Sequence, residues 1–300
     1  MKFSDPKVTH SVLLVDGMPL AYANQAKIGH LANSAGEPTG MIFGFLRSVN
    51  AYAKRYKCDK VVVAWDLSGT PIKAQGFVGY KSGRALTVDK MVARIQLSRL
   101  REIIGQTWWS QVDAFGFEAD DVLGTLARRF EINSLVDSIR IVTSDHDLLQ
   151  LVTNRITWVD AREKDLKRQE WNVERVFAEY GVKPEQLCLY RAVEGDKSDH
   201  IPGLGWTKPR LFDLKVRLLA CGGQVEPDMK RSLWNDEEWI TVKRNFDLMT
   251  LYEPAKLNVT KGIGSDSALL EAFNQLESKL LVKDLLAYVR PYWSKLKLTE

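Results

Sequence analysis

The chain repeatedly places a carboxylate where an apolar, strand-like run ends. Asp16 ends the run LLVD, Asp66 follows VVVAW, and Asp145 follows IVTS. Helix-like segments separate these runs, and this β-α-β order is typical of a parallel sheet. In an open α/β sheet, ligands bind at the carboxyl ends of the strands, so these acids are expected to meet at one edge. The sequence therefore predicts an α/β fold with a parallel central sheet flanked by helices.

Two regions are expected from the pattern of elements. Strands are predicted at about 11–15, 61–65, 139–143 and 156–159, and helices at about 40–56, 87–105 and 118–130. Past residue 171 the pattern changes to helices, at about 173–180, 209–220, 237–250 and 266–289. We therefore predict a core over residues 1–170 and a helical region over residues 171–300.

Nine acidic residues recur at these strand ends and helix starts. They are Asp16, Asp66, Glu118, Asp120, Asp121, Asp145, Asp147, Asp196 and Asp199. Carboxylates gathered in one cleft repel each other unless cations neutralise them. Oxygen ligands without a matching His or Cys set favour Mg²⁺ or Mn²⁺ over Zn²⁺. The pattern predicts two divalent ions side by side, the usual arrangement for cleaving phosphodiesters.

Each local motif also has a structural explanation. Asp16 and Asp66 alone could be turn formers, and the acids of FEADD could serve only the positive end of a helix dipole. On extended chain Asp145 and Asp147 would point the same way, with His146 facing elsewhere. The repeated placement of the acids at strand ends favours the metal hypothesis.

The charge balance favours a polyanionic partner. Setting the nine acids apart from the 38 Asp and Glu leaves 29 against 42 Lys and Arg, a charge of about +13 for the remaining surface. An ordinary basic protein with scattered acids would give the same totals. The positions of the motifs favour the polyanion-binding protein over this alternative. A basic body around an acidic cleft suits a nucleic-acid backbone.

Two further segments are predicted to contact nucleic acid. In FVGYKSGR, Lys81 and Arg84 can hold a scissile phosphate and Tyr80 can stack on a base, although a solvated basic loop has the same composition. In GDKSDHIPGLGWTKPR a glycine-rich turn opens a helix, which resembles a helix-hairpin-helix element at about 184–220. Its predicted DNA contacts are Gly203, Gly205, Lys208 and Arg210.

The expected setting is a reducing cytoplasm. No apolar run approaches the ~18 residues of a membrane span. The N-terminus MKFSDPKVTH has no signal-like apolar segment, and three widely spaced cysteines form neither a disulfide framework nor a zinc set. We expect a monomer without membrane contact.

The ordered set of motifs resembles the flap endonuclease/5′-nuclease family. Asp16, Asp66, YKxxR, ExDD, DxD, GDxxD and IPGxG follow one another over residues 11–220, as in bacteriophage 5′-3′ exonucleases and flap endonucleases and the 5′-nuclease domain of bacterial DNA polymerase I. The resemblance implies a PIN-like nuclease core and a helical arch at about 82–105. It further implies that Lys81 and Arg84 form the base of the arch. By the same resemblance, one metal ion is served by Asp16, Asp66, Glu118, Asp120 and Asp121, and a second by Asp145, Asp147, Asp196 and Asp199.

The activity implied by the resemblance is two-metal, structure-specific 5′-nuclease chemistry that removes RNA primers or 5′ flaps during replication. It implies two Mg²⁺ ions, replaceable by Mn²⁺, and DNA with a 5′ flap, nick or end, or an RNA/DNA hybrid, as substrate. A separate polymerase or single-strand-binding protein would be a partner, in a bacterial cytoplasm or a phage-infected cell. The alternatives are an RNA-directed nuclease of the same fold and a noncatalytic DNA-junction binding module.

One departure from the family pattern lies in the hairpin. The family commonly has SDNIPGVxGIGxKTA, whereas SDHIPGLGWTKPRL replaces the Asn with His200 and shortens the turn. The family hairpin is associated with a bound K⁺ held by backbone carbonyls. The shorter turn therefore leaves a K⁺ site here in doubt.

Overall fold

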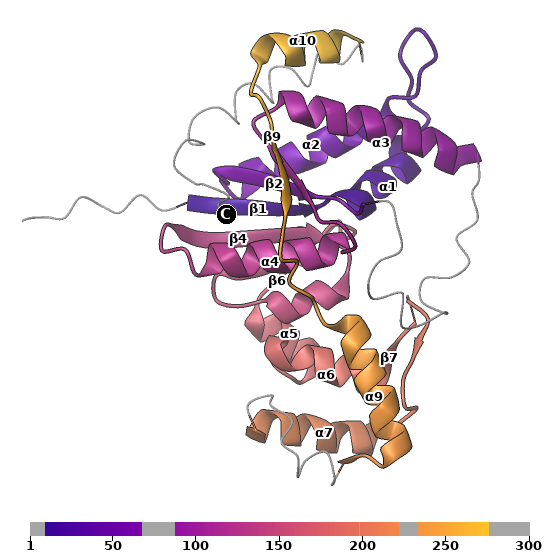
Figure 1. Ribbon diagram of the computed structural model, residues 1–300, viewed down its shortest axis with the longest axis vertical. Helices are drawn as coiled ribbons and strands as arrows, with labels where there is room; N and C mark the ends of the chain where they lie inside the picture. Colours follow the sequence, from indigo (N-terminus) through magenta and orange to yellow (C-terminus); the bar gives the residue numbers. More distant parts are fainter. Residues whose placement is uncertain (1–9, 68–87, 198, 222–232, 276–300) are drawn as a thin grey trace, which may run out of the picture.

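The computed structural model describes residues 10–67, 88–197, 199–221 and 233–275 (Figure 1). Within these residues, no helix has the length and apolar character needed to cross a membrane.

A seven-stranded sheet forms the centre of the fold, in the order β6-β5-β4-β1-β2-β3-β9. The strands are β1 (His10–Asp16), β2 (Lys60–Ala64), β3 (Ser110–Asp113), β4 (Val136–Thr143), β5 (Ile156–Asp160), β6 (Glu170–Trp171) and β9 (Asn258–Lys261). The strands from β5 to β3 are parallel, whereas β6 and β9 are antiparallel at the two edges. The predicted α/β fold with a parallel central sheet is confirmed, with an antiparallel strand added on each side.

The central strands are apolar throughout because helices cover both faces of the sheet. Side chains 12–15 of β1 and 61–64 of β2 are at most 2% exposed. A strand that is buried on both faces has no polar side to alternate with the apolar one. This is why the sequence shows continuous apolar runs here.

The helices form one layer on each face of the sheet (Figure 1). One layer contains α1 (Gly17–Ile28), α2 (Gly40–Arg55) and α3 (Val88–Gln106), with α10 (Asp266–Gln275) packed against α3. The other face is covered by α4 (Ala119–Glu131), beside which lie α5 (Val173–Tyr180) and α6 (Pro184–Glu194). Helices α7 (Lys208–Cys221) and α9 (Asp236–Met249) pack on α6, away from the sheet.

Two predicted boundaries need correction. The region 171–300 is not purely helical, because β9 returns to the core and pairs with β3. The arch is predicted over about residues 82–105, but the part of this range in α3 packs on the core. Ala93, Leu100 and Ile104 of this helix are buried there. Residues 82–87 lie outside the described part of the chain, so an arch over them stays a prediction.

A helix, a short hairpin and a second helix follow one another in the C-terminal half, as predicted for residues 184–220. Helix α6 leads into the hairpin of β7 (Gly195–Asp196) and β8 (Ile201–Pro202), and α7 follows. DNA binding by this element stays a prediction.

Candidate metal centre and nucleic-acid interface

Asp16 and Asp66 lie at neighbouring strand ends, as the sequence predicts. Asp16 is the last residue of β1, pairs in register with Ala64 of β2, and is 3% exposed. The Thr143 hydroxyl, at the end of β4, donates a 2.8 Å hydrogen bond to Asp16 Oδ2. Asp66, two residues after β2, accepts a 2.7 Å bond at Oδ1 from the backbone N–H of Ala119. The first two acids are thereby tied to β4 and to the start of α4.

The acids of FEADD lie at the N-terminus of α4, which begins at Ala119. Glu118 is its N-cap residue, and Asp120 and Asp121 lie in the first turn. Asp121 accepts at Oδ2 from the Glu118 N–H (3.3 Å) and at Oδ1 from the Tyr252 N–H (2.8 Å). Asp121 is 1% exposed, whereas Asp120 is half-buried. Asp121 thus helps to fix the start of the helix, while Asp120 is more accessible, and a metal contact by either residue stays a prediction.

Asp145 has an extended backbone but Asp147 lies in a helix, which corrects the sequence argument for the direction of their side chains. The 3₁₀ helix η2 (His146–Leu151) begins directly after Asp145. The Asp145 carboxylate caps this helix by accepting a 2.8 Å bond from the Asp147 N–H. The relative position of the two acids is therefore set by this N-cap hydrogen bond and not by the alternation of side chains along a strand.

His146, which lies between the two acids in the sequence, contacts aromatic side chains. Its Nδ1 is 2.9 Å from the Tyr180 hydroxyl, and its ring contacts the Trp158 ring edge-on, with 5.4 Å between centroids. Burial is the main cause that lowers the pKa of His146 below its usual value. These contacts give His146 a packing role.

Arg191 is a site residue that the sequence analysis missed. It projects from α6 and donates from Nη1 to Asp147 and from Nη2 to Asp196. Arg191 is 8% exposed and Asp196 9%, so the three groups form a buried ionic cluster. Asp199, the other acid predicted for this group, is half-buried in the turn after β7. The one signal in the sequence was an arginine within this helix, five residues before Asp196.

The acids lie along one end of the sheet in two groups, held by internal donors. Across the described ranges, no three side chains of His, Cys, Asp or Glu are close enough together to hold a metal ion. Backbone amides, Thr143 and Arg191 bond to individual carboxylates of the nine, and the assignment of these acids to metal ions stays a prediction. The donors are carboxylate oxygens, a chemistry that fits a hard divalent ion.

The predicted phosphate contacts have different outcomes. Tyr80, Lys81 and Arg84 lie outside the described residues, and their roles stay predictions. Lys208 is exposed in the first turn of α7. Arg210 makes hydrogen bonds of 2.8 and 3.0 Å to Glu238, and its guanidinium lies 3.7 Å from the Trp206 ring centroid. This contact joins α7 to α9, which gives Arg210 a structural role, and a phosphate contact by it stays untested.

The two hairpin glycines differ in their surroundings. A Cβ on Gly203 would lie 2.0 Å from the Glu194 carbonyl oxygen, so the glycine allows the hairpin to approach the end of α6. Gly205 has φ +65° and open space around it. Packing thus explains Gly203 without DNA, and Gly205 is the accessible one. His200, which replaces the family Asn, has φ +59°, a conformation that His and Asn adopt more readily than most residues.

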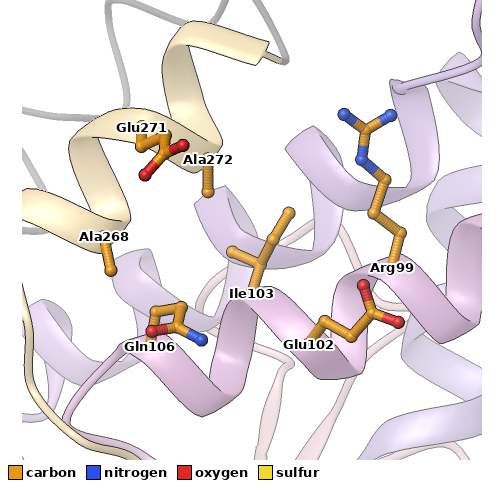
Figure 2. Close-up of a pocket in the computed structure, with 7 residues that line it drawn as sticks. All are labelled: Arg99, Glu102, Ile103, Gln106, Ala268, Glu271 and Ala272. Atoms are coloured by element: carbon orange, nitrogen blue, oxygen red, sulfur yellow. The ribbon is translucent and has the colours of Figure 1, made fainter.

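A groove of about 260 Å³ lies between α3 and α10, on the face of the sheet that α4 does not cover (Figure 2). It is lined by Arg99, Glu102, Ile103, Gln106, Ala268, Glu271 and Ala272. None of the nine predicted metal ligands lines this groove. The groove is therefore separate from the predicted metal site.

Fold and site together define an α/β protein with carboxylates at the carboxyl edge of a mostly parallel sheet. The chain belongs to the 5′-3′ exonuclease family, because residues 11–181 match the family described as 5′-3′ exonuclease, N-terminal resolvase-like domain. The family predicted from the motifs is thereby confirmed.

Individual relatives agree with this assignment. The chain is 38% identical over 240 residues to a thermostable DNA polymerase I of Thermus thermophilus, which covers 78% of the chain and 28% of the polymerase. It is 26% identical to a 5′-3′ exonuclease of Aquifex aeolicus, which covers 92% of the chain and 95% of that protein. The fold resembles the bacteriophage T5 D15 flap endonuclease, solved as a pseudo-enzyme-product complex with DNA and metal ions, with a TM-score of 0.62 and 17% identity over 93% of this chain and 99% of that one.

Proposed function

We propose that this protein is a structure-specific 5′-nuclease that hydrolyses phosphodiesters near the junction of a 5′ single strand and duplex DNA. The observation that carries the proposal is the gathering of Asp16, Asp66, the α4 acids and Asp145 at one end of the sheet. The family assignment and the DNA and metal ions bound to the T5 D15 flap endonuclease support it. We propose further that it removes RNA primers or 5′ flaps in the cytoplasm of a bacterium or phage-infected cell, together with a DNA polymerase or a single-strand-binding protein.

The chain's own residues divide the work. When bound, divalent ions supply activation of water and neutralisation of the charge on the phosphate. Asp16, Asp66, Glu118, Asp120 and Asp121 would hold one Mg²⁺ or Mn²⁺ ion, and Asp145, Asp147, Asp196 and Asp199 the other. Asp121 already accepts two backbone bonds, so we assign it contact through water. Lys81 and Arg84 would hold the scissile phosphate.

Cleavage is expected to require Mg²⁺ or Mn²⁺, because the carboxylates would otherwise repel the phosphate. The measurement is a gel assay on a 5′-labelled flap with Mg²⁺, with Mn²⁺ and with excess EDTA. Activity should stop with EDTA and return when excess Mg²⁺ is added. Undiminished cleavage in EDTA would exclude the metal assignment.

The same assay separates the alternatives. A noncatalytic junction-binding module would shift the flap in a binding gel but leave it intact in Mg²⁺. An RNA-directed nuclease would cleave a flap with a 5′ RNA strand and spare the matched all-DNA flap. Cleavage of the DNA flap close to the junction is the result expected here.

Lys208→Ala is expected to weaken flap binding about equally for all DNA sequences. If Lys208 contacts one phosphate of the duplex, the slope of log affinity against log salt should fall by roughly 1. Affinity for a flap and for its isolated single strand, measured from low to moderate salt, tests this, and only the flap should respond.

Lys57→Ala is the matched control for Lys208→Ala. Lys57 is an exposed lysine before β2, at the end of the sheet opposite the acids. Lys57→Ala should leave the affinity for the flap, and the slope of log affinity against log salt, unchanged. Equal effects of the two substitutions would mean that the hairpin is not the duplex contact.

A further inference from the structure

We propose that Arg191 is a built-in counter-ion of the second carboxylate group, which aligns Asp147 with Asp196 and weakens the binding of a divalent ion there. The inference deepens the proposed function and rests on it, because it concerns the acids assigned to the second ion. Arg191 is a positioning residue in this proposal.

The geometry that carries the inference is a bridge in which the two terminal nitrogens of one guanidinium each bond to a different carboxylate. Arg191 Nη1 donates to Asp147 Oδ1 and Nη2 donates to Asp196 Oδ2. Asp147 comes from η2 and Asp196 from β7, so the guanidinium joins two elements that lie 44 and 5 residues from Arg191 in the chain. Because α6 packs directly against η2, the arginine is fixed by its own helix. A guanidinium is planar and stays charged in proteins, so it suits this bridging position.

The surroundings show that this is not a surface salt bridge. The side chains of Arg191, Asp147 and Asp196 are 10%, 14% and 9% exposed. Buried charges interact strongly because water screens them little. One arginine between two carboxylates leaves a net charge of −1, and Asp145 adds a further negative charge nearby. The cluster therefore remains attractive to a cation.

Two opposing effects on a divalent ion follow. The guanidinium orients the two carboxylates, yet its own positive charge repels an incoming ion and it occupies one oxygen of each acid. Removing the charge should strengthen ion binding at this group and, at the same time, destabilise the protein without ions, since the two acids would then repel each other.

The test compares Arg191→Met and Arg191→Lys with wild type in the full chain. Methionine keeps an extended stem without charge, and lysine keeps the charge without the bridge. Thermal unfolding is followed in EDTA and over a Mg²⁺ series, and Mn²⁺ binding is titrated by calorimetry. We expect Arg191→Met to have a lower melting temperature than wild type in EDTA, and a larger rise in melting temperature when Mg²⁺ is added. Of its two Mn²⁺ ions, the more weakly bound one should bind about tenfold more tightly than in wild type. Arg191→Lys should bind Mn²⁺ as weakly as wild type.

Arg210→Met serves as the matched control, because Arg210 also bridges two elements through a carboxylate, Glu238, away from the acids at the strand ends. It should lower the melting temperature equally with and without Mg²⁺. If Arg191→Met behaves in the same way, Arg191 is only structural and the inference is wrong. If Arg191→Met does not fold in EDTA but folds in Mg²⁺, the inference is supported. If it folds in neither, Arg191→Gln replaces it, and an unchanged Mn²⁺ affinity there overturns the inference.

The two proposals fail in distinguishable ways. Absence of any Mn²⁺ binding to the wild-type chain would contradict the metal-dependent function and this inference together. Two Mn²⁺ ions bound by wild type, with no change in Arg191→Met, would contradict only the inference. Nuclease activity is not needed for either result.

Discussion

Asp120→Asn is expected to slow flap cleavage by about 100-fold or more while leaving the fold intact. Even residues that only orient a metal ligand change activity by about 10–100-fold when replaced, so loss of a ligand charge should cost at least as much. Asp120 is half-buried in the first turn of α4, and Asn preserves its shape. Loss of its interaction with the helix dipole should cost only about 0.3–1 kcal/mol. Single-turnover kinetics and thermal unfolding measure the two effects separately.

Asp121→Asn is the informative comparison, because the Asp121 carboxylate stabilises the local structure. Both Asp121 oxygens accept backbone N–H groups in a buried position. An amide can accept at one of them only, so we expect a loss of about 1–3 kcal/mol in the free energy of unfolding. Asp137→Asn, on an exposed acid of β4, should change neither quantity. Near-normal cleavage by Asp120→Asn would contradict the assignment of Asp120 to a metal.

The sheet could be predicted because its central strands are buried on both faces. The runs 12–15 and 61–64 are apolar without interruption, and Asp16 and Asp66 follow them directly. Parallel pairing then brings the strand ends to one edge, which is why two acids 50 residues apart could be placed together from sequence. The motif order added the family, which residues 11–181 confirm.

Features that depend on partners distant in the sequence could not be predicted in this way. Strand β9 has the sequence NVTK with mostly exposed side chains, and it exists because the edge of β3 supplies its hydrogen bonds. Helix α1 buries a glycine and an asparagine, Gly17 and Asn24, beside Leu20 and Ala21, so its buried face does not appear as an apolar stripe in the sequence. For both, the tertiary neighbours decide the conformation.

The second acid group was misjudged for a related reason. The argument for Asp145 and Asp147 assumed extended chain, whereas the Asp145 carboxylate caps a 3₁₀ helix and turns the chain. In the sequence, Arg191 is the one basic residue of its helix, and nothing local marks its partners. Its partners, Asp147 and Asp196, are brought to it by packing of α6 on η2. Pairwise ionic contacts of this kind are fixed by the fold and leave no local pattern.

Gly203→Ala is expected to lower the free energy of unfolding by about 3 kcal/mol, the upper end of the usual range for overpacking. The new methyl carbon would lie 2.0 Å from the Glu194 carbonyl oxygen and 2.8 Å from the Gly195 nitrogen, both of them backbone atoms that cannot turn away. The hairpin must therefore move away from the end of α6. The hydrogen bond from the Leu204 N–H to the Val193 carbonyl, 2.9 Å in the present structure, should be lost. Urea unfolding at constant Mg²⁺ measures the change.

The same displacement should reach the second acid group, since Asp196 pairs with Ile201 across this hairpin and bonds to Arg191. A shift of about 1 Å in a catalytic group can reduce a rate on the order of 100-fold, so cleavage by Gly203→Ala should fall by a similar factor. Gly205→Ala is the control: its φ of +65° costs an alanine about 1 kcal/mol, but nothing lies within 4 Å of the added carbon. We expect Gly205→Ala to lose a little stability and to keep the wild-type rate at saturating enzyme. Equal losses of stability and rate in the two variants would mean that turn conformation, and not the close approach of Gly203 to α6, positions Asp196.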